Sequence, residues 1–167
     1  MTDSQQDDID VITSQWQHIG LEADFASLQI VARILRLGKT LDNQLSKLHA
    51  NFDLKQGEFD VLAALKRCGD IALTPSQLHQ SMLLSSGAMT SRLDRLEKKQ
   101  LIVRKHCQQD RRSIKVKLTA KGRDLINQVY PAHFRHIDNL LSAVSDQDKT
   151  QLTQLLRTGL HAIDTAL

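Results

Sequence analysis

The chain has 167 residues and a formal net charge of +3, which suits one domain with additional helices for assembly. Apolar residues make up 41% and charged residues 25%, a globular balance, while an aromatic content of 4% argues against an all-β sandwich. Seven Gly and two Pro leave few turn-forming residues, which favours long helices. Because no apolar run approaches the roughly 18 residues of a membrane span and the acidic start is unlike a signal peptide, we expect a soluble, cytoplasmic protein.

Charge is strongly segregated along the chain. Residues 1–24 hold six acidic residues and no Lys or Arg. Residues 85–117 hold ten Lys and Arg against three Asp and Glu, a net +7, which leaves −4 for the remainder. A basic block in an otherwise acidic chain is typical of a protein that binds a polyanion. A solvated charged face is the alternative interpretation.

Two amphipathic helices are predicted first. The spacing over residues 7–19 predicts a helix whose apolar face should dock on another element, and that face consists of Ile9, Ile12, Trp16 and Ile19. Gly20 ends this helix, Asp24 is an N-cap candidate, and a long helix follows to about Ala50. The apolar stripe of the long helix consists of Leu28, Val31, Leu35, Leu41, Leu45 and Leu48.

The middle of the chain predicts three further helices. A helix over about residues 55–68 should bury Phe59, Leu62 and Leu65. The segment Thr74-Pro75-Ser76-Gln77 matches a capping box and predicts a short helix to about residue 81. The next helix extends to about residue 99, and its inward face consists of Met89, Leu93 and Leu96. Two short helices, of which the second has a polar, basic outer face, indicate a helix-turn-helix.

A hairpin and two helices are predicted after it. Alternating apolar residues over 101–106 and 113–118 predict two strands with a polar, cationic tip. Thr119 should cap a helix that passes Pro131, where a kink is expected, and residues 145–148 open the last helix. The apolar face of that helix consists of Leu152, Leu155, Leu156, Leu160 and Ile163. The terminal helices carry more apolar surface than the central module covers, which predicts a dimer.

The expected fold is therefore mainly α with a small β-hairpin wing, a winged helix-turn-helix with N- and C-terminal dimerisation helices. Three segments follow from this interpretation. Residues 1–50 hold the extra N-terminal helix and a dimerisation helix, residues 51–118 the DNA-binding domain, and residues 119–167 the C-terminal dimerisation helices.

A more specific signal comes from three motifs between residues 83 and 122. They are the polar second helix, Asp110-Arg111-Arg112 at the hairpin tip, and Leu118-Thr119-x-x-Gly122 at the entry to the next helix. In this combination the chain resembles the MarR family of bacterial winged helix-turn-helix regulators. The resemblance implies a homodimeric transcriptional regulator, a repressor, which binds a pseudopalindromic operator on double-stranded DNA and releases it when a small ligand or oxidant arrives.

The chain departs from the usual family pattern at two places. Gln100 stands where the family commonly has Gly after the recognition helix, and Cys107-Gln108 stands where Asp-Pro is common. At the first of these positions a left-handed residue commonly ends the helix, and glycine adopts that conformation with less strain than Gln100 does. The second puts the conformation of the hairpin tip in question.

Candidate DNA contacts follow from helix faces and from the resemblance. Polar side chains that lie off the apolar face of the recognition helix can reach base edges or phosphates in a major groove. At the wing tip, Arg112 resembles the family's minor-groove arginine, and Asp110 is expected to orient the wing by pairing with an Arg. The full set consists of Ser86, Thr90, Ser91, Arg92, Arg95, Arg111 and Arg112.

The extra N-terminal helix and the segment 58–67 are similar to the urate-responsive subgroup of the family. This similarity implies a urate-like effector bound by Trp16, Asp60, Arg67 and Arg104. Asp60 and Arg67 are seven residues apart and so share a helix face. A planar anionic purine needs an aromatic surface and a guanidinium fork, which these residue types provide. Lys66 stands where the subgroup often has a second Arg.

Structural interpretations of the effector residues stay open. Trp16 is also explained as a docking residue of its amphipathic helix, and Asp60 with Arg67 as an ion pair of small energetic weight. His133 and His136 share a helix face, but no nearby third ligand completes a metal site.

The two cysteines support a rival trigger. Cys68 is interpreted as a small, buried apolar residue. Cys107, beside Lys105 and His106, is a candidate reactive thiol or simply an exposed hairpin residue. A thiol-based redox sensor is therefore the rival of a ligand sensor, and a winged-helix module that binds an acidic protein is the alternative outside DNA regulation. The sequence offers no nucleophile and base pair, phosphate loop or metal ligand set, so we expect no enzyme, cofactor or metal.

Overall fold

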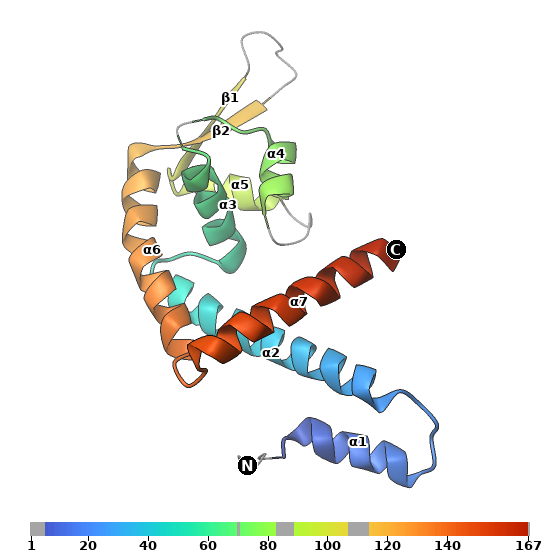
Figure 1. Cartoon of the computed structure of the whole chain (residues 1–167). Coiled ribbons are helices and arrows are strands. Elements are labelled where there is room, and N and C mark those ends of the chain that lie inside the picture. Colours follow the sequence, from blue (N-terminus) through green and yellow to red (C-terminus); the bar gives the residue numbers. More distant parts are fainter. Residues whose placement is uncertain (1–5, 70, 83–88, 107–113, 167) are drawn as a thin grey trace. The chain divides into compact units, whose positions relative to one another are not determined.

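The computed structural model describes residues 6–69, 71–82, 89–106 and 114–166. The chain divides into two compact units, Met1–Gln56 and Gly57–Leu167 (Figure 1). Among the described residues, none of the helices combines the length and apolar character needed to cross a membrane.

The first unit contains two helices, α1 (Asp8–His18) and α2 (Phe25–Ala50). Asp24 caps α2 as predicted, because its carboxylate accepts bonds from the amides of Ala26 and Ser27. Asp7 caps α1 and forms a capping box with Asp10. Both predicted helices are thus confirmed, with ends within a residue or two of the expected ones.

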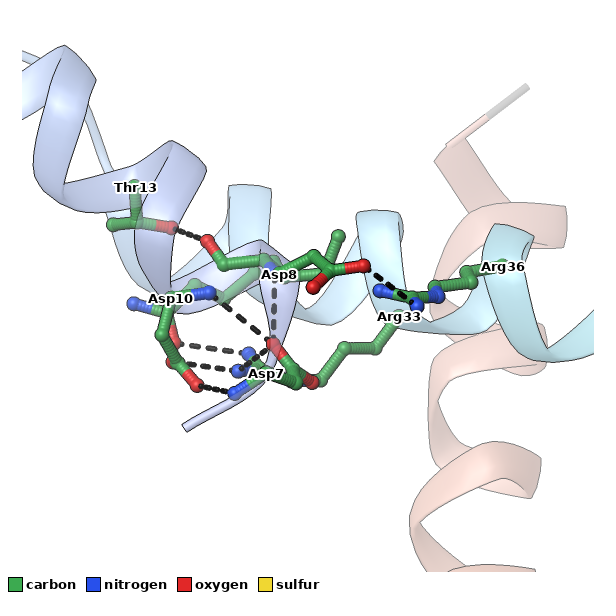
Figure 2. A network of polar contacts seen from close by, with 8 residues as sticks. Asp7, Asp8, Asp10, Thr13, Arg33 and Arg36 are labelled. Atoms are coloured by element: carbon green, nitrogen blue, oxygen red, sulfur yellow. Dashed lines mark hydrogen bonds and ion pairs between the residues drawn. The ribbon is translucent and has the colours of Figure 1, made fainter. Parts of the chain in front are cut away.

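Ion pairs fasten α1 to α2 (Figure 2). Arg33 of α2 contacts the carboxylates of Asp7, at 2.9 Å, and Asp10, at 2.6 Å. Arg36, one turn further along α2, lies 2.8 Å from the carboxylate of Asp8. The acidic start of the chain is therefore matched by two arginines of the next helix.

The predicted docking face of α1 is only partly covered in the single chain. Ile9 is buried, but Ile12, Trp16 and Ile19 are 43%, 44% and 69% exposed. The second buried residue of α1 is Thr13, whose hydroxyl donates to the carbonyl of Ile9. Most of the apolar stripe of α1 therefore stays exposed in the single chain.

The second unit follows the predicted order. It consists of α3 (Gln56–Arg67), α4 (Pro75–Ser81), α5 (Met89–Lys98), β1 (Ile102–His106), β2 (Ile114–Leu118), α6 (Ala120–Leu140) and α7 (Asp146–Ala166). The strands pair antiparallel, from Ile102 opposite Leu118 to His106 opposite Ile114. Leu73 forms an isolated antiparallel β-bridge with Val116, in which each residue's amide donates to the other's carbonyl. A mainly helical fold with a two-stranded wing is confirmed.

The core of this unit lies among α3, α4, α5, β2 and α6. Its fully buried apolar side chains are Val61, Leu62, Ala64, Leu78, Leu96, Val116, Ile126 and Val129. Predicted core residues Phe59, Leu62 and Leu65 of α3 are all buried. This packing supports α4, α5 and the root of the hairpin.

The C-terminal helices differ in burial. Helix α6 continues through Pro131, while α7 contains no buried residue among those described. The apolar face of α7 is open in the single chain, with Leu155, Leu160 and Ile163 at least 60% exposed. Such a face on an ordered helix indicates a partner surface.

Candidate nucleic-acid interface

The recognition-helix candidate α5 has one buried and one exposed face. Leu93 and Leu96 are 2% and 0% exposed and hold the helix against the core. Thr90 and Ser91, two of the predicted DNA contacts, are exposed on the other side. The structure thus places these hydroxyls where a duplex can reach them.

A buried carboxylate lies under α5. Glu58, in the first turn of α3, has a fully buried side chain. Its carboxylate oxygens accept bonds from Arg95 Nε at 2.6 Å and from Lys99 Nζ at 3.0 Å. Since Arg95 and Lys99 are four residues apart, a single acid fixes one cation of α5 and another directly after its end. A buried carboxylate of α3 therefore fixes the positions of Arg95 and Lys99.

Arg92, one of the predicted DNA contacts, lies against α3. A Cβ atom on Gly57 would overlap its guanidinium Nε and lie 2.7 Å from Cζ, so the side chain lies directly over the glycine backbone. Its Nη1 atom is buried and has no hydrogen-bond partner among the described residues. This position limits the reach of Arg92 toward a duplex, and its role in DNA binding stays a prediction.

The root of the wing is tied to α5 by Arg104. Its guanidinium lies 2.5 Å from Asp94 and 2.7 Å from Glu97, and its backbone amide also donates to Glu97. The hydrogen bond from Arg104 is the largest cause that holds the pKa of Glu97 below its usual range. The orientation of the hairpin therefore depends on charges carried by the recognition helix.

A second junction joins the hairpin to α6. Thr119 caps α6 by accepting a bond from the amide of Gly122, and its hydroxyl donates to the carbonyl of Gln100. Lys121 donates to the carbonyl of Lys99. Gln100 itself has φ of +60°, the left-handed conformation that the family's usual glycine would adopt more easily.

Several predicted residues lie outside the described part of the chain. They are Ser86, Cys107, Asp110, Arg111 and Arg112. Cys68 is half-buried, with a free thiol. Among the described residues, no group of three or more His, Cys, Asp or Glu side chains is arranged to hold a metal ion.

The effector candidates are distributed over both units. Trp16 belongs to the first unit, and Asp60, Arg67 and Arg104 belong to the second. Asp60 is half-buried on α3, whereas exposed Arg67 donates to the backbone carbonyl of Ser81 at 2.9 Å. Arg67 and Arg104 thus have different partners in this structure, and the effector set stays a prediction.

Sequence reasoning missed the role of Glu58. The residue is four and seven positions before Leu62 and Leu65, a spacing that places it on the buried face of α3. A carboxylate on such a face needs a cationic partner, because an unpaired buried charge is very costly. That signal predicts a partner of positive charge, although it does not say which one.

Comparisons with known proteins identify the family. The MarR family model matches residues 54–114. The HTH-type transcriptional regulator PecS of Dickeya dadantii is 34% identical over 155 residues, which cover 92% of this chain and 93% of PecS. The chain belongs to the MarR family.

Two further relatives agree with this assignment. The transcriptional repressor MprA of Escherichia coli is 31% identical over 126 residues, which cover 75% of this chain and 71% of MprA. The crystal structure of a mutant MarR from E. coli complexed with operator DNA superposes with a TM-score of 0.71 at 25% identity and covers 83% of this chain and 99% of that chain. The protein is thus a DNA-binding transcriptional regulator with a winged-helix fold.

Proposed function

We propose that this MarR-family regulator is a homodimeric repressor that binds a pseudopalindromic operator through α5 and the wing. The observation that carries the proposal is the exposed hydroxyl and cationic face of α5, held on a buried core by Leu93, Leu96 and Glu58. A repressor role is supported by the relative MprA, which is named a transcriptional repressor, and operator binding by the MarR complex.

The exposed apolar face of α7 supports a homodimer. Its leucines and Ile163 are 40–65% exposed, and α2 carries further exposed apolar residues such as Val31 and Leu35. A soluble monomer rarely leaves such stripes open. Two copies of the +7 segment would then face one duplex, with recognition helices about one helical turn apart.

A DNA titration tests this proposal. Operator affinity should fall by about a thousandfold between about 50 and 200 mM salt if about six phosphates are neutralised. The same protein should enrich a palindromic sequence from a randomised duplex pool. Salt-insensitive binding, or equal affinity for every duplex, would contradict DNA regulation and favour a protein-interaction module.

For the signal that releases DNA, we propose a urate-like anion recognised by Trp16, Asp60, Arg67 and Arg104. The residue types support it, since an anionic purine is matched by an indole ring and guanidinium groups. An anion near Asp60 is unfavourable unless one group moves or protonates, so binding would disturb α3. The loss of DNA-binding free energy equals the difference in effector affinity between the DNA-free and the DNA-bound protein, typically about 1 to 3 kcal/mol.

Urate provides the direct test. Because Trp16 is the one tryptophan of the chain, urate should quench its fluorescence and lower operator affinity. Arg67→Ala should lose both effects and still bind DNA, whereas Arg135→Ala, an exposed arginine of α6, should retain both. Unchanged fluorescence and DNA affinity at millimolar urate would remove this effector.

A thiol trigger is the competing outcome. Thiolate is required for reversible oxidation, so Cys68→Ser combined with Cys107→Ser should abolish release of DNA by peroxide if a thiol is the sensor. We expect this double variant to respond normally to the true effector. Loss of that response would favour the redox sensor.

A further inference from the structure

A relay of side chains connects the buried face of α3 with the exposed face of α5. Glu58 is 0% exposed, and one of its oxygens holds Arg95 through Nε at 2.6 Å. The same guanidinium donates from Nη1 to the hydroxyl oxygen of Ser91 at 2.6 Å. Ser91 is exposed and lies one turn before Arg95. The relay Glu58–Arg95–Ser91 thus runs from the core to the surface expected to face DNA.

The direction of these bonds follows from chemistry. A guanidinium can only donate hydrogen bonds, so Ser91 must be the acceptor in its bond with Arg95. A serine hydroxyl has one hydrogen, and this hydrogen is left to donate to another group. A charged donor also polarises the hydroxyl and strengthens the bond that it donates. Ser91 is therefore prepared to act as a donor.

We propose that Glu58 and Arg95 are positioning residues that fix Ser91 as a hydrogen-bond donor toward an acceptor atom of DNA. The inference rests on the proposed function, because it requires α5 to face a duplex. Acceptors of the right chemistry are phosphate oxygens and, in the major groove, N7 and O6 of guanine, O4 of thymine and N7 of adenine. The amino groups of cytosine and adenine are donors and cannot accept this hydrogen.

The geometry favours positioning over simple stabilisation. A buried ion pair often contributes little net stability, because desolvation offsets the attraction between the charges. Here Glu58 and Ser91 hold two different nitrogens of one guanidinium, which fixes its plane. Lys99 contacts the second oxygen of Glu58, so the carboxylate keeps its place when Arg95 is bonded to Ser91. A donor prepared in this way loses little side-chain entropy on binding.

The test uses the full-length protein and duplex DNA. A randomised duplex pool is selected with wild type, and dissociation constants are then measured for the best selected duplex and for an unselected one. Ser91→Ala should weaken binding of the selected duplex roughly tenfold, the loss expected for about one hydrogen bond per half-site. Ser91→Thr, which keeps the hydroxyl, should retain binding, and Ser142→Ala, at an exposed position beyond α6, should bind like wild type.

Glu58→Gln separates positioning from a direct contact. This variant removes the charge but keeps the shape, and should also weaken binding roughly tenfold. Combined with Ser91→Ala it should cause no further loss, since both changes remove the same bond. Thermal unfolding of each variant and selection of new duplexes with Ser91→Ala are measured beside affinity. A changed base preference would identify a base acceptor, and an unchanged preference with uniformly weaker binding a phosphate, and either supports the proposal.

Three results would overturn the inference. They are wild-type affinity of Ser91→Ala for the selected duplex, multiplicative losses in the double variant, and retention of full binding by Glu58→Gln. If Glu58→Gln unfolds, the comparison of Ser91→Ala with Ser91→Thr decides by itself, because Ser91 is exposed. Failure of wild type to select any duplex would contradict the proposed function, whereas duplex selection by wild type together with unweakened binding by the variants would contradict the relay alone.

Discussion

The backbone of Gly122, in the first turn of α6, lies directly against the carbonyl group of Leu101. A Cβ atom at position 122 would overlap the carbonyl oxygen and lie 2.9 Å from the carbonyl carbon. That oxygen also accepts a bond from the amide of Thr119 at 3.1 Å. The start of α6 therefore approaches the start of the wing more closely than any residue with a side chain allows.

Gly122→Ala should destabilise the second unit. The added methyl group meets backbone, which cannot rotate away, so a loss of roughly 1 to 3 kcal/mol in the free energy of unfolding is expected. Urea unfolding followed by circular dichroism measures it. Gly38→Ala is the control, since a Cβ atom there meets nothing within 4 Å and α2 should gain up to about 1 kcal/mol. Equal stability of Gly122→Ala and wild type would contradict the close approach.

Gln100→Gly should stabilise the protein. Gln100 has φ of +60°, which costs a residue with a Cβ atom roughly 1 to 2 kcal/mol and costs glycine nothing. The greater freedom of glycine in the unfolded chain offsets part of this gain, so we expect a net increase of about 0.5 to 1 kcal/mol. Gln100→Ala, which keeps the strain, should show no such gain. A lower melting temperature for Gln100→Gly would show that the strain is absent.

The local features were predictable from short stretches of sequence. Thr74 and Gln77 form the predicted capping box, with both reciprocal bonds present. In the hairpin, the alternation correctly places Val116 and Leu118 on the buried side, but Ile114, predicted on the same side, is 37% exposed and Ile102, predicted on the other side, is buried. Such features depend on neighbours within a few residues, where propensity and periodicity act directly.

The contacts that shape the candidate interface were not predictable in the same way. Glu58 and Arg95 are separated by 37 residues, and no local pattern specifies their pairing. For α1, the apolar stripe indicated a docking face, of which the single chain covers Ile9 and leaves Trp16 and Ile19 exposed. Periodicity detects a face that could be buried, whereas the partner that covers it depends on tertiary structure.

Arg33→Ala should loosen α1. Arg33 holds both Asp7 and Asp10, while Arg36 contacts Asp8 alone and is more exposed. Amide hydrogen exchange over residues 8–18 should therefore accelerate clearly in Arg33→Ala and little in Arg36→Ala.

The same network predicts a dependence on pH. Arg33 is the largest cause that lowers the pKa of Asp7 below its ordinary 3.8. The stabilising contribution of this carboxylate is therefore complete above its unfolded pKa and is lost as pH falls through the lower, folded value. Exchange rates in wild-type α1 should approach those of Arg33→Ala in strong acid. Equal rates in the two variants at neutral pH would show that the pairs of Arg33 do not fasten α1.

His133 should make stability fall under mildly acidic conditions. Its ring lies 4.5 Å from that of Phe59 and 5.6 Å from that of Phe134, between centroids. Burial, and next the charge of His136, lower the pKa of His133 below the ordinary 6.5. Below about pH 6.5 the unfolded chain therefore binds the proton first, so the free energy of unfolding decreases as pH falls toward the folded pKa.

Substitution of His133 isolates this effect. His133→Phe keeps an aromatic ring beside Phe59 and removes the titration, so stability between about pH 7 and 5 should decrease less than in wild type. His161→Phe, at an exposed position on α7, should leave the slope unchanged. Urea midpoints at several pH values measure both slopes. A wild-type slope in His133→Phe would assign the acid sensitivity to another group.

The wing and the recognition helix should contribute differently to DNA binding. Arg112, at the tip, is expected in a narrow minor groove, where its charge adds affinity with little dependence on base sequence. Thr90 is exposed on α5 and is expected at base edges, so Thr90→Ala should change the preference at particular base pairs.

Selection from a randomised duplex pool, run in parallel for wild type and both alanine variants, separates affinity from preference. Arg112→Ala should bind the wild-type sequence more weakly and with a smaller salt dependence, because one cationic charge per protomer is lost from the DNA interface. Wild-type affinity of Arg112→Ala, or an altered consensus in that variant with an unaltered one in Thr90→Ala, would contradict this division.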